Sequence, residues 1–219
     1  MDARWITERW IPRASSNMAS RDQELRLGRA RLLAGRYPHA AEALQFYSHL
    51  VSFDGDAGAL RRLVMRHGPQ LLRDAAAANR EPALGFYDRV LMRLHPPPAE
   101  APHSNRCPRC GQPPQAGVLH PEGHGATFHL LCSLCLEQWR FPRAQCPRCG
   151  EEKLSYHTAD SMPHVHVQMC EACGCYLHVV DLEKDPAAQP DVDEIAALAL
   201  DVWAIDQGYE KIHPNLIGI

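Results

Sequence analysis

Two copies of one cysteine motif constrain the fold of this chain more than any other feature of its sequence. The string CPRCG occupies residues 107–111 and recurs, letter for letter, at 146–150. Each copy is followed by a second C-x-x-C pair, CSLC at 132–135 and CEAC at 170–173. The offset between the copies is 39 residues for the first pair and 38 for the second. The region is therefore an internal repeat, and it contains eight of the nine cysteines.

The cysteine spacing is typical of structural metal sites. Two cysteines separated by two residues can face one point from a single tight turn, and two such turns complete a tetrahedral shell of four thiolates. A glycine follows the second cysteine at Gly111, Gly150 and Gly174, where it permits the positive φ that such a turn needs. The intervals of 21 and 20 residues between paired motifs leave room for one hairpin per site. We predict one site at Cys107, Cys110, Cys132 and Cys135 and a second at Cys146, Cys149, Cys170 and Cys173.

Disulfides and thioredoxin-type redox motifs are the other interpretations of C-x-x-C. Residues 1–20 contain no apolar segment of the secretory-signal type, and the motifs do not open a helix in a βαβ pattern. We therefore expect a cytoplasmic protein, in which thiols stay reduced and bind metal. The longest apolar stretch, 195–205, is interrupted by Asp201 and is too short to span a bilayer, so no membrane insertion is expected.

The two halves of the chain differ in charge. Residues 1–106 contain 16 Arg, no Lys and 11 acidic residues, which gives +5, whereas residues 107–219 contain 7 basic and 15 acidic residues, which gives −8. A zinc ribbon that binds nucleic acid needs basic residues to neutralise phosphates, so the cysteine half has the wrong sign for that role. We interpret the scattered arginines as solvated helix faces or as a surface for an acidic partner.

The first half of the chain has the periodicity of helices. A capping box of Ser20 and Gln23 predicts the start of a helix that ends near Tyr37-Pro38, after an irregular N-terminal segment of 19 residues. Four more helices are expected up to Leu94, two of them with Pro69 and Pro82 at the first helical position. We predict that residues 1–101 form a helical bundle that ends in a stiff, Pro-rich linker.

The cysteine half is predicted to contain short strands and one final helix. Each strand lies beside a C-x-x-C pair, as a rubredoxin-like or zinc-ribbon unit requires. We expect a first ribbon at 102–145 and a second ribbon with the helix at 146–219, so the fold class is α+β. The predicted strands are Ala126–Leu131, Trp139–Phe141, Leu154–Thr158, His164–Met169 and Tyr176–Leu182. The helix should be capped by Asp191 and Glu194, bury Ile195, Leu198, Ala199, Val202 and Ile205, and end at Gly208.

Several other residues of this half belong to types that can bind metal ions. Eight thiolates already complete two four-sulfur sites, so we interpret the histidines as surface groups or neighbours of the ligands. Cys175 stands where the first copy has Glu137, and its sequence position is compatible with a buried apolar residue or with a reactive thiol beside the second site. The histidines concerned are His120, His124, His129, His157, His164, His166 and His178.

No combination of residues indicates catalysis. The sequence contains no phosphate-binding loop, no G-x-S-x-G motif and no patterned set of serine, histidine and acid. Closed four-thiolate sites also offer no open coordination position for a substrate. We therefore expect a protein that is not an enzyme.

The repeat and several C-terminal strings together resemble a known family. Besides the CPRCG repeats and their answering pairs, the segment YLHVVDLEKD at 176–185 and the endings DVWA at 201–204 and NLIG at 215–218 resemble the formate dehydrogenase accessory protein family, of the FdhE type. The likeness covers roughly residues 104–219, and a weaker likeness runs through 25–50. The region before the first cysteine is shorter than is usual in that family.

The resemblance implies an accessory factor rather than a formate dehydrogenase. Members are expected to bind the molybdenum-containing catalytic subunit of a respiratory formate dehydrogenase in the cytoplasm before its export, using two rubredoxin-like centres formed by the eight cysteines. Four thiolates suit zinc and iron alike, and the resemblance favours two iron ions. A rubredoxin-like electron carrier and a zinc-ribbon interaction protein are the alternatives, and a homodimer also remains open.

Overall fold

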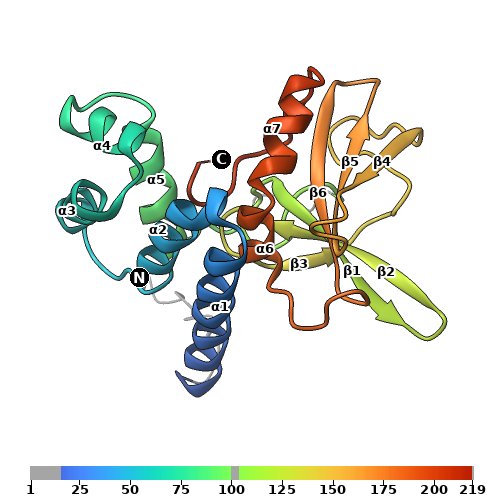
Figure 1. The fold of residues 1–219 in the computed structure, drawn as a ribbon, viewed down its shortest axis with the longest axis horizontal. Helices are drawn as coiled ribbons and strands as arrows, with labels where there is room; N and C mark the ends of the chain where they lie inside the picture. Colours follow the sequence, from blue (N-terminus) through green and yellow to red (C-terminus); the bar gives the residue numbers. More distant parts are fainter. Residues whose placement is uncertain (1–15, 100–103, 219) are drawn as a thin grey trace, which may run out of the picture.

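A computed structural model of the chain describes residues 16–99 and 104–218. It contains a group of N-terminal helices, one mixed β-sheet, and two short helices that lie between them (Figure 1). The helices are α1 (Ser16–Arg36), α2 (Ala41–Val51), α3 (Ala57–His67), α4 (Gln70–Ala77), α5 (Ala83–Leu94), α6 (Pro190–Ala196) and α7 (Leu198–Asp206), with a 3-10 turn η1 (Pro38–Ala40) before α2. The strands are β1 (Pro114–Glu122), β2 (Gly125–Cys132), β3 (Gln138–Arg140), β4 (Leu154–Thr158), β5 (Val165–Cys170), β6 (Cys175–Asp181) and β7 (Glu210–Lys211).

The five predicted N-terminal helices are present, but some of their starts differ from the prediction. Helix α1 begins at Ser16, so the capping box at Ser20 is wrong; residues 1–15 of the predicted irregular segment lie outside the described residues. Pro69 and Pro82 precede α4 and α5 as cap residues instead of occupying the first helical position. Either position suits proline, because the first N–H groups of a helix have no partner within it.

One sheet contains strands from both cysteine repeats. The strand order is β3-β2-β1-β6-β5-β4, and β7 pairs with β6 outside this path. Strand β1 of the first repeat runs parallel to β6 of the second, with Ala116 opposite His178 and Leu119 opposite Asp181. The two repeats are therefore joined by backbone pairing at the centre of the sheet. The boundary expected at 145/146 falls between β3 and β4, and the division into separate domains stays a prediction.

The central strand β1 is absent from the sequence prediction. Pro114, Gly117 and Pro121 fall within it, and such residues argue against a central strand. Pro114 is the first residue of the strand and lies at an irregularity in the pairing with β2, so its missing N–H is tolerated there. Gly117 has a packing role, because a Cβ at this position would lie 2.5 Å from the ring of Phe128.

The helices and the sheet share one hydrophobic core. It includes Leu33 of α1, Phe46 of α2, Val180 of β6 and Ile195 of α6. Helix α6 contacts α1 and α2 on one side and β1 and β6 on the other, so it lies between the two layers (Figure 1). The Pro-rich linker is not a free spacer, because the backbone N–H of Ala99 donates to the carbonyl of Arg109, 3.0 Å away in the first CPRC turn.

The predicted C-terminal helix is two helices, and its buried face differs from the prediction. Val202 and Ile205 are 54% and 60% exposed, although the helical pattern assigned them to the core. Asp191 and Glu194 are buried and do not cap the helix, which starts after Gln189 with Pro190 in its first turn. The geometry at Gly208 confirms the predicted end of the helix. Gly208 has φ +86, and the N–H groups of Gly208 and the next residue bond back to the last turn of α7.

Buried ion pairs fasten helix α1 to helix α6. The guanidinium of Arg29 donates to Asp193, with Nε 3.0 Å from Oδ2, and to Asp185 at 2.6 Å. One turn earlier, Arg26 pairs with Asp191 at 3.2 Å, and the hydroxyl of Tyr47 also donates to Asp191. Asp193 is fully buried, so its carboxylate needs the guanidinium of Arg29 as a partner.

We predict that Gly117→Ala destabilises the sheet. The added methyl group must displace the buried Phe128 ring, which should lower the free energy of unfolding by about 1–3 kcal/mol in urea denaturation. Gly125→Ala is the matched control, because a Cβ there meets only one atom, 4.0 Å away. An equal loss in both variants would contradict the packing role of Gly117.

We also predict that Arg29→Met weakens the contact between the helices and the sheet. The substitution leaves Asp193 buried without its cation, which should cost about 3–5 kcal/mol of unfolding free energy. Arg31→Met, on the same helix, removes only an exposed guanidinium that bonds to the carbonyl of Leu27, and it should change stability by less than about 0.5 kcal/mol. Similar denaturation curves for Arg29→Met and the unaltered chain would show that the ion pair contributes little.

Candidate metal centres

The first predicted cysteine set forms a compact cluster. Cys107 and Cys110 come from the first CPRC turn, Cys132 ends β2, and Cys135 follows in the next turn. The Sγ atom of Cys110 lies 3.4 Å from that of Cys132 and 3.5 Å from that of Cys135, and the Sγ atoms of Cys107 and Cys135 are 3.6 Å apart. All four ligand atoms are within 4.8 Å of one another, and Trp139 packs against the cluster.

The second set repeats this arrangement with more solvent exposure. Cys146 lies 3.7 Å from Cys173, and Cys149 lies 3.6 Å from Cys170, sulfur to sulfur. Cys170 ends β5, as Cys132 ends β2 in the first repeat. Cys149 is exposed, whereas its counterpart in the first set is buried. The two clusters therefore share a geometry but differ in access to solvent.

The same backbone bonds close the turns of both repeats. Cys107 N donates to Gln112 O at 2.9 Å, and Cys146 N donates to Glu151 O at 2.8 Å. Gly111, Gly150 and Gly174 have positive φ, as expected from the sequence. The remaining turn uses Leu136 at φ +59 in the position of Gly174. This left-handed conformation is uncommon for a residue with a Cβ, so the sequence did not reveal it.

The sulfur distances suit a tetrahedral metal ion. A metal–sulfur bond of about 2.3 Å implies sulfur–sulfur edges of about 3.8 Å, close to the observed separations. In the first cluster, the backbone N–H groups of Leu134 and Cys135 also donate to Cys132 Sγ, at 3.3 and 3.4 Å, which stabilises a thiolate. Each cluster could thus bind one metal ion, and an all-sulfur donor set suits zinc and iron equally.

Sulfur contacts and burial shift the pKa values of the thiols in opposite directions within each cluster. The hydrogen bond with Cys132 lowers the pKa of Cys135 to about 5, whereas burial raises the pKa of Cys107 to about 11. In the second cluster, the bond with Cys175 lowers the pKa of Cys146 to about 4. In the same cluster, burial raises the pKa of Cys170. Each cluster thus contains a thiol that ionises readily and a buried thiol that resists ionisation, and a bound cation would favour the thiolate form of both.

Cys175 lies beside the second cluster and is buried. Its sulfur is 3.0 Å from that of Cys173 and 3.7 Å from that of Cys146. Its burial agrees with the first interpretation that the sequence allowed, a buried apolar residue, and its position beside the site agrees with the second. Whether Cys175 reacts remains a prediction.

Three of the histidines interpreted as surface groups or neighbours of the ligands are buried. His164, His166 and His178 are less than a tenth exposed, and burial lowers the pKa values of His166 and His178 to about 4, so both stay neutral. They share the interior with Asp193, Glu194 and Asp201, whose burial was not predicted from the sequence. The available signal was the run of acids within the apolar segment 191–201.

Two further groups of potential ligands in the described residues already contain a side-chain cation. His164, Asp185 and Asp193 surround Arg29, whose guanidinium donates to both carboxylates. The second group surrounds the ammonium of Lys211, which pairs with Glu194 and lies 2.9 Å from Asp201. In both groups a basic side chain supplies the charge that a metal ion would supply. The third member of the second group is His178.

Comparison with known proteins identifies the family. A family model of the FdhE central domain matches residues 106–143, and one of the FdhE C-terminal domain matches residues 144–217, so together they cover about half of the chain. The chain belongs to the FdhE family. Residues 16–105 lie before the matched region and include all five N-terminal helices.

Relatives in the FdhE family are similar over about half of the chain. An FdhE homolog from Aquifex aeolicus is 36% identical over 119 residues, which cover 52% of this chain and 42% of that protein. One from Pseudomonas putida is 36% identical over 120 residues, 51% of this chain and 38% of that protein. The chain thus spans about two fifths of the length of these relatives.

A solved FdhE structure has the same fold. The crystal structure of the FdhE protein from Pseudomonas aeruginosa aligns with a TM-score of 0.53 and 23% identity, over 93% of this chain and 96% of that one. The alignment therefore extends through the N-terminal helices. None of the helices in the described part of the chain is long and apolar enough to cross a membrane.

We predict that Cys107→Ser with Cys110→Ser halves the metal content. Elemental analysis should fall from about two ions per chain to about one, because a tetrahedral site cannot form from two thiolates. Structural metal contributes on the order of 10 kcal/mol to folding, so the midpoint of unfolding should also fall.

The matched control for this experiment is Cys175→Ser, which changes a cysteine outside the predicted sets. Its metal content should stay at about two ions per chain. An unchanged metal content in the double variant would show that the ligand assignment is wrong.

Proposed function

We propose that this chain is a formate dehydrogenase accessory protein that binds the catalytic subunit of a respiratory formate dehydrogenase during its maturation in the cytoplasm. The observation that carries the proposal is the match of both FdhE domain models to one continuous region, residues 106–217. Two clusters of four cysteines within that region support it, because both have the geometry of closed structural sites. Closed sites favour a binding role over catalysis.

We assign a structural role to the metal ions, with iron as the proposed metal. One ion would be held by Cys107, Cys110, Cys132 and Cys135, and the other by Cys146, Cys149, Cys170 and Cys173. A metal held by four thiolates crosslinks two turns that are distant in sequence. The crosslinks would keep the edges of the sheet rigid for binding a partner.

Exposed apolar side chains offer two surfaces for the partner. On α1, Leu25 and Leu32 are 51% and 56% exposed and lie seven residues apart on one face. On α7, Val202 and Ile205 are exposed to a similar extent. We propose that the catalytic subunit contacts both surfaces, so that the helices and the sheet contribute together.

We predict that acidic substitutions on either surface weaken the complex. The tagged full chain should recover the catalytic subunit in co-purification, and Val202→Glu with Ile205→Glu, or Leu25→Glu with Leu32→Glu, should reduce recovery about tenfold or more. Metal content and unfolding midpoints of the variants establish that they are folded. Leu71→Glu on α4, where the side chain is 82% exposed, is the control and should leave recovery unchanged.

Two outcomes would contradict parts of this proposal. Unchanged recovery by the α1 variant would exclude the N-terminal helices from recognition. No recovery by the unaltered chain would reject stable binding of the catalytic subunit and favour an electron carrier.

The exposure of Cys149 favours that second candidate function. A rubredoxin-like carrier needs a redox metal close to the protein surface, and the second cluster has an exposed ligand position. The iron-loaded chain would then reduce the catalytic subunit without forming a stable complex with it. Absorbance changes of the iron centre on mixing with the purified subunit separate the two functions.

A further inference from the structure

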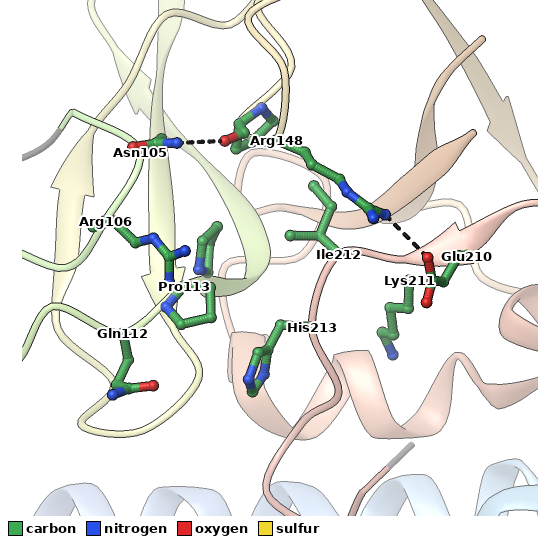
Figure 2. Close-up of a pocket in the computed structure, with 11 residues that line it drawn as sticks. Asn105, Arg106, Gln112, Pro113, Arg148, Glu210, Lys211, Ile212 and His213 are labelled. Carbon is green, nitrogen blue, oxygen red and sulfur yellow. Dashed lines mark hydrogen bonds and ion pairs between the residues drawn. The ribbon is translucent and has the colours of Figure 1, made fainter. Parts of the chain in front are cut away.

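A cavity of about 410 Å³ lies between the two cysteine repeats. Its walls come from the residues around the first CPRC turn, from the second CPRC turn, and from the C-terminal segment that contains β7 (Figure 2). Sites for small organic ligands in proteins typically have volumes of about 300–1,000 Å³. The cavity therefore has the size of a small-ligand site, and none of the ligand cysteines lines it.

Hydrogen bonds and strand pairing hold the three walls together. The side-chain amide of Asn105 donates to Pro147 O at 3.0 Å, which connects the first wall to the second turn. Strand β7 pairs with β6, with Glu210 opposite Cys175. Behind β7, the ammonium of Lys211 is fastened to Glu194 and Asp201 in the buried charge cluster. The shape of the cavity is thus set by both repeats and by α6 and α7.

The charge of the cavity is positive, although residues 107–219, which supply most of its lining, carry a net negative charge. Arg148 is paired with Glu210 at 3.1 Å, and the charge of Lys211 is directed at its buried carboxylates. Arg106 remains, and within the described ranges no carboxylate forms an ion pair with it. Figure 2 shows its guanidinium extending toward the centre of the cavity. An unpaired arginine in a concave site attracts an anion.

Neutral groups complete a binding site for an anion with several oxygens. The amide of Gln112 lies on the same wall as Arg106, and His213 lies across from it (Figure 2). The ring of His213 donates through Nδ1 to Pro214 O at 2.7 Å, because a carbonyl oxygen only accepts. Its Nε2 is then an acceptor, available to a donor group on the organic part of a ligand. Ile212 and Pro113 add apolar surface for the remainder of a small molecule.

We propose that this cavity binds the phosphate group of a small ligand of about nucleotide size. Arg106 would contact the phosphate from one wall, and Arg148 would contact it from the other on leaving its exposed ion pair with Glu210. A tetrahedral phosphate offers oxygens in several directions, so it can accept bonds from both walls, whereas a planar carboxylate presents only two oxygens. The volume exceeds that of a bare anion and leaves space for an attached organic group.

Titration calorimetry on the metal-loaded full chain tests the proposal, with AMP, pyrophosphate and inorganic phosphate as probes. AMP should bind more tightly than inorganic phosphate, because the cavity also contacts its organic part. Arg106→Ala should weaken AMP binding by about tenfold or more, the effect of losing a charge-assisted hydrogen bond.

Arg109→Ala is the matched control, since Arg109 is an exposed arginine of the first CPRC turn that does not line the cavity. It should change the affinity for AMP less than about twofold. Elemental analysis must give the same metal content in both variants, so that a lower affinity for AMP cannot result from loss of a metal site. Absence of AMP binding at millimolar concentration, or an equal loss in the two variants, would overturn the proposal. The measurement needs only this chain, so its result is independent of the proposed client.

Discussion

The parallel pairing of β1 with β6 is the interaction on which the rest of the structure depends. It joins the two cysteine repeats through backbone hydrogen bonds in the centre of one sheet, from Ala116 to Leu119 on one strand and from His178 to Asp181 on the other. Without it, each repeat would be a small ribbon with an exposed strand edge. With it, the two cysteine clusters lie in one sheet, and the cavity between the CPRC turns has fixed walls.

Helix α6 connects the sheet to the N-terminal helices. Its apolar side packs into the shared core, and its acidic residues pair with basic residues from other parts of the chain. Asp191 and Asp193 meet arginines of α1, while Glu194 meets Lys211 and Asn215. Charges this deeply buried are tolerated only with their partners, so the pairing specifies how the helices sit on the sheet. A partner that contacts both α1 and α7 would therefore meet a rigid surface.

The two cysteine clusters combine similar geometry with different exposure. The first is packed under Trp139, which suits a purely structural ion. The second has the exposed Cys149 and a fifth thiol, Cys175, within sulfur contact of two members. The two copies of the motif thus have different surroundings, and the second cluster is the more accessible to solvent.

Local features of this protein can be predicted from its sequence, because they depend on residues that are near one another along the chain. The spacing of the cysteines predicted the two clusters, the positive φ of Gly111 and Gly150 followed from the turn, and periodicity located the helices and most strands. Tertiary structure decided the rest. Strand β1 forms despite Pro114 and Gly117, because its neighbours on both sides supply pairing and Phe128 fills the space above the glycine. Asp193 appears in the sequence as an ordinary helical acid, and only the approach of Arg29, 164 residues away, makes it a buried ion-pair partner. Such contacts depend on distance in space, which local pattern does not encode.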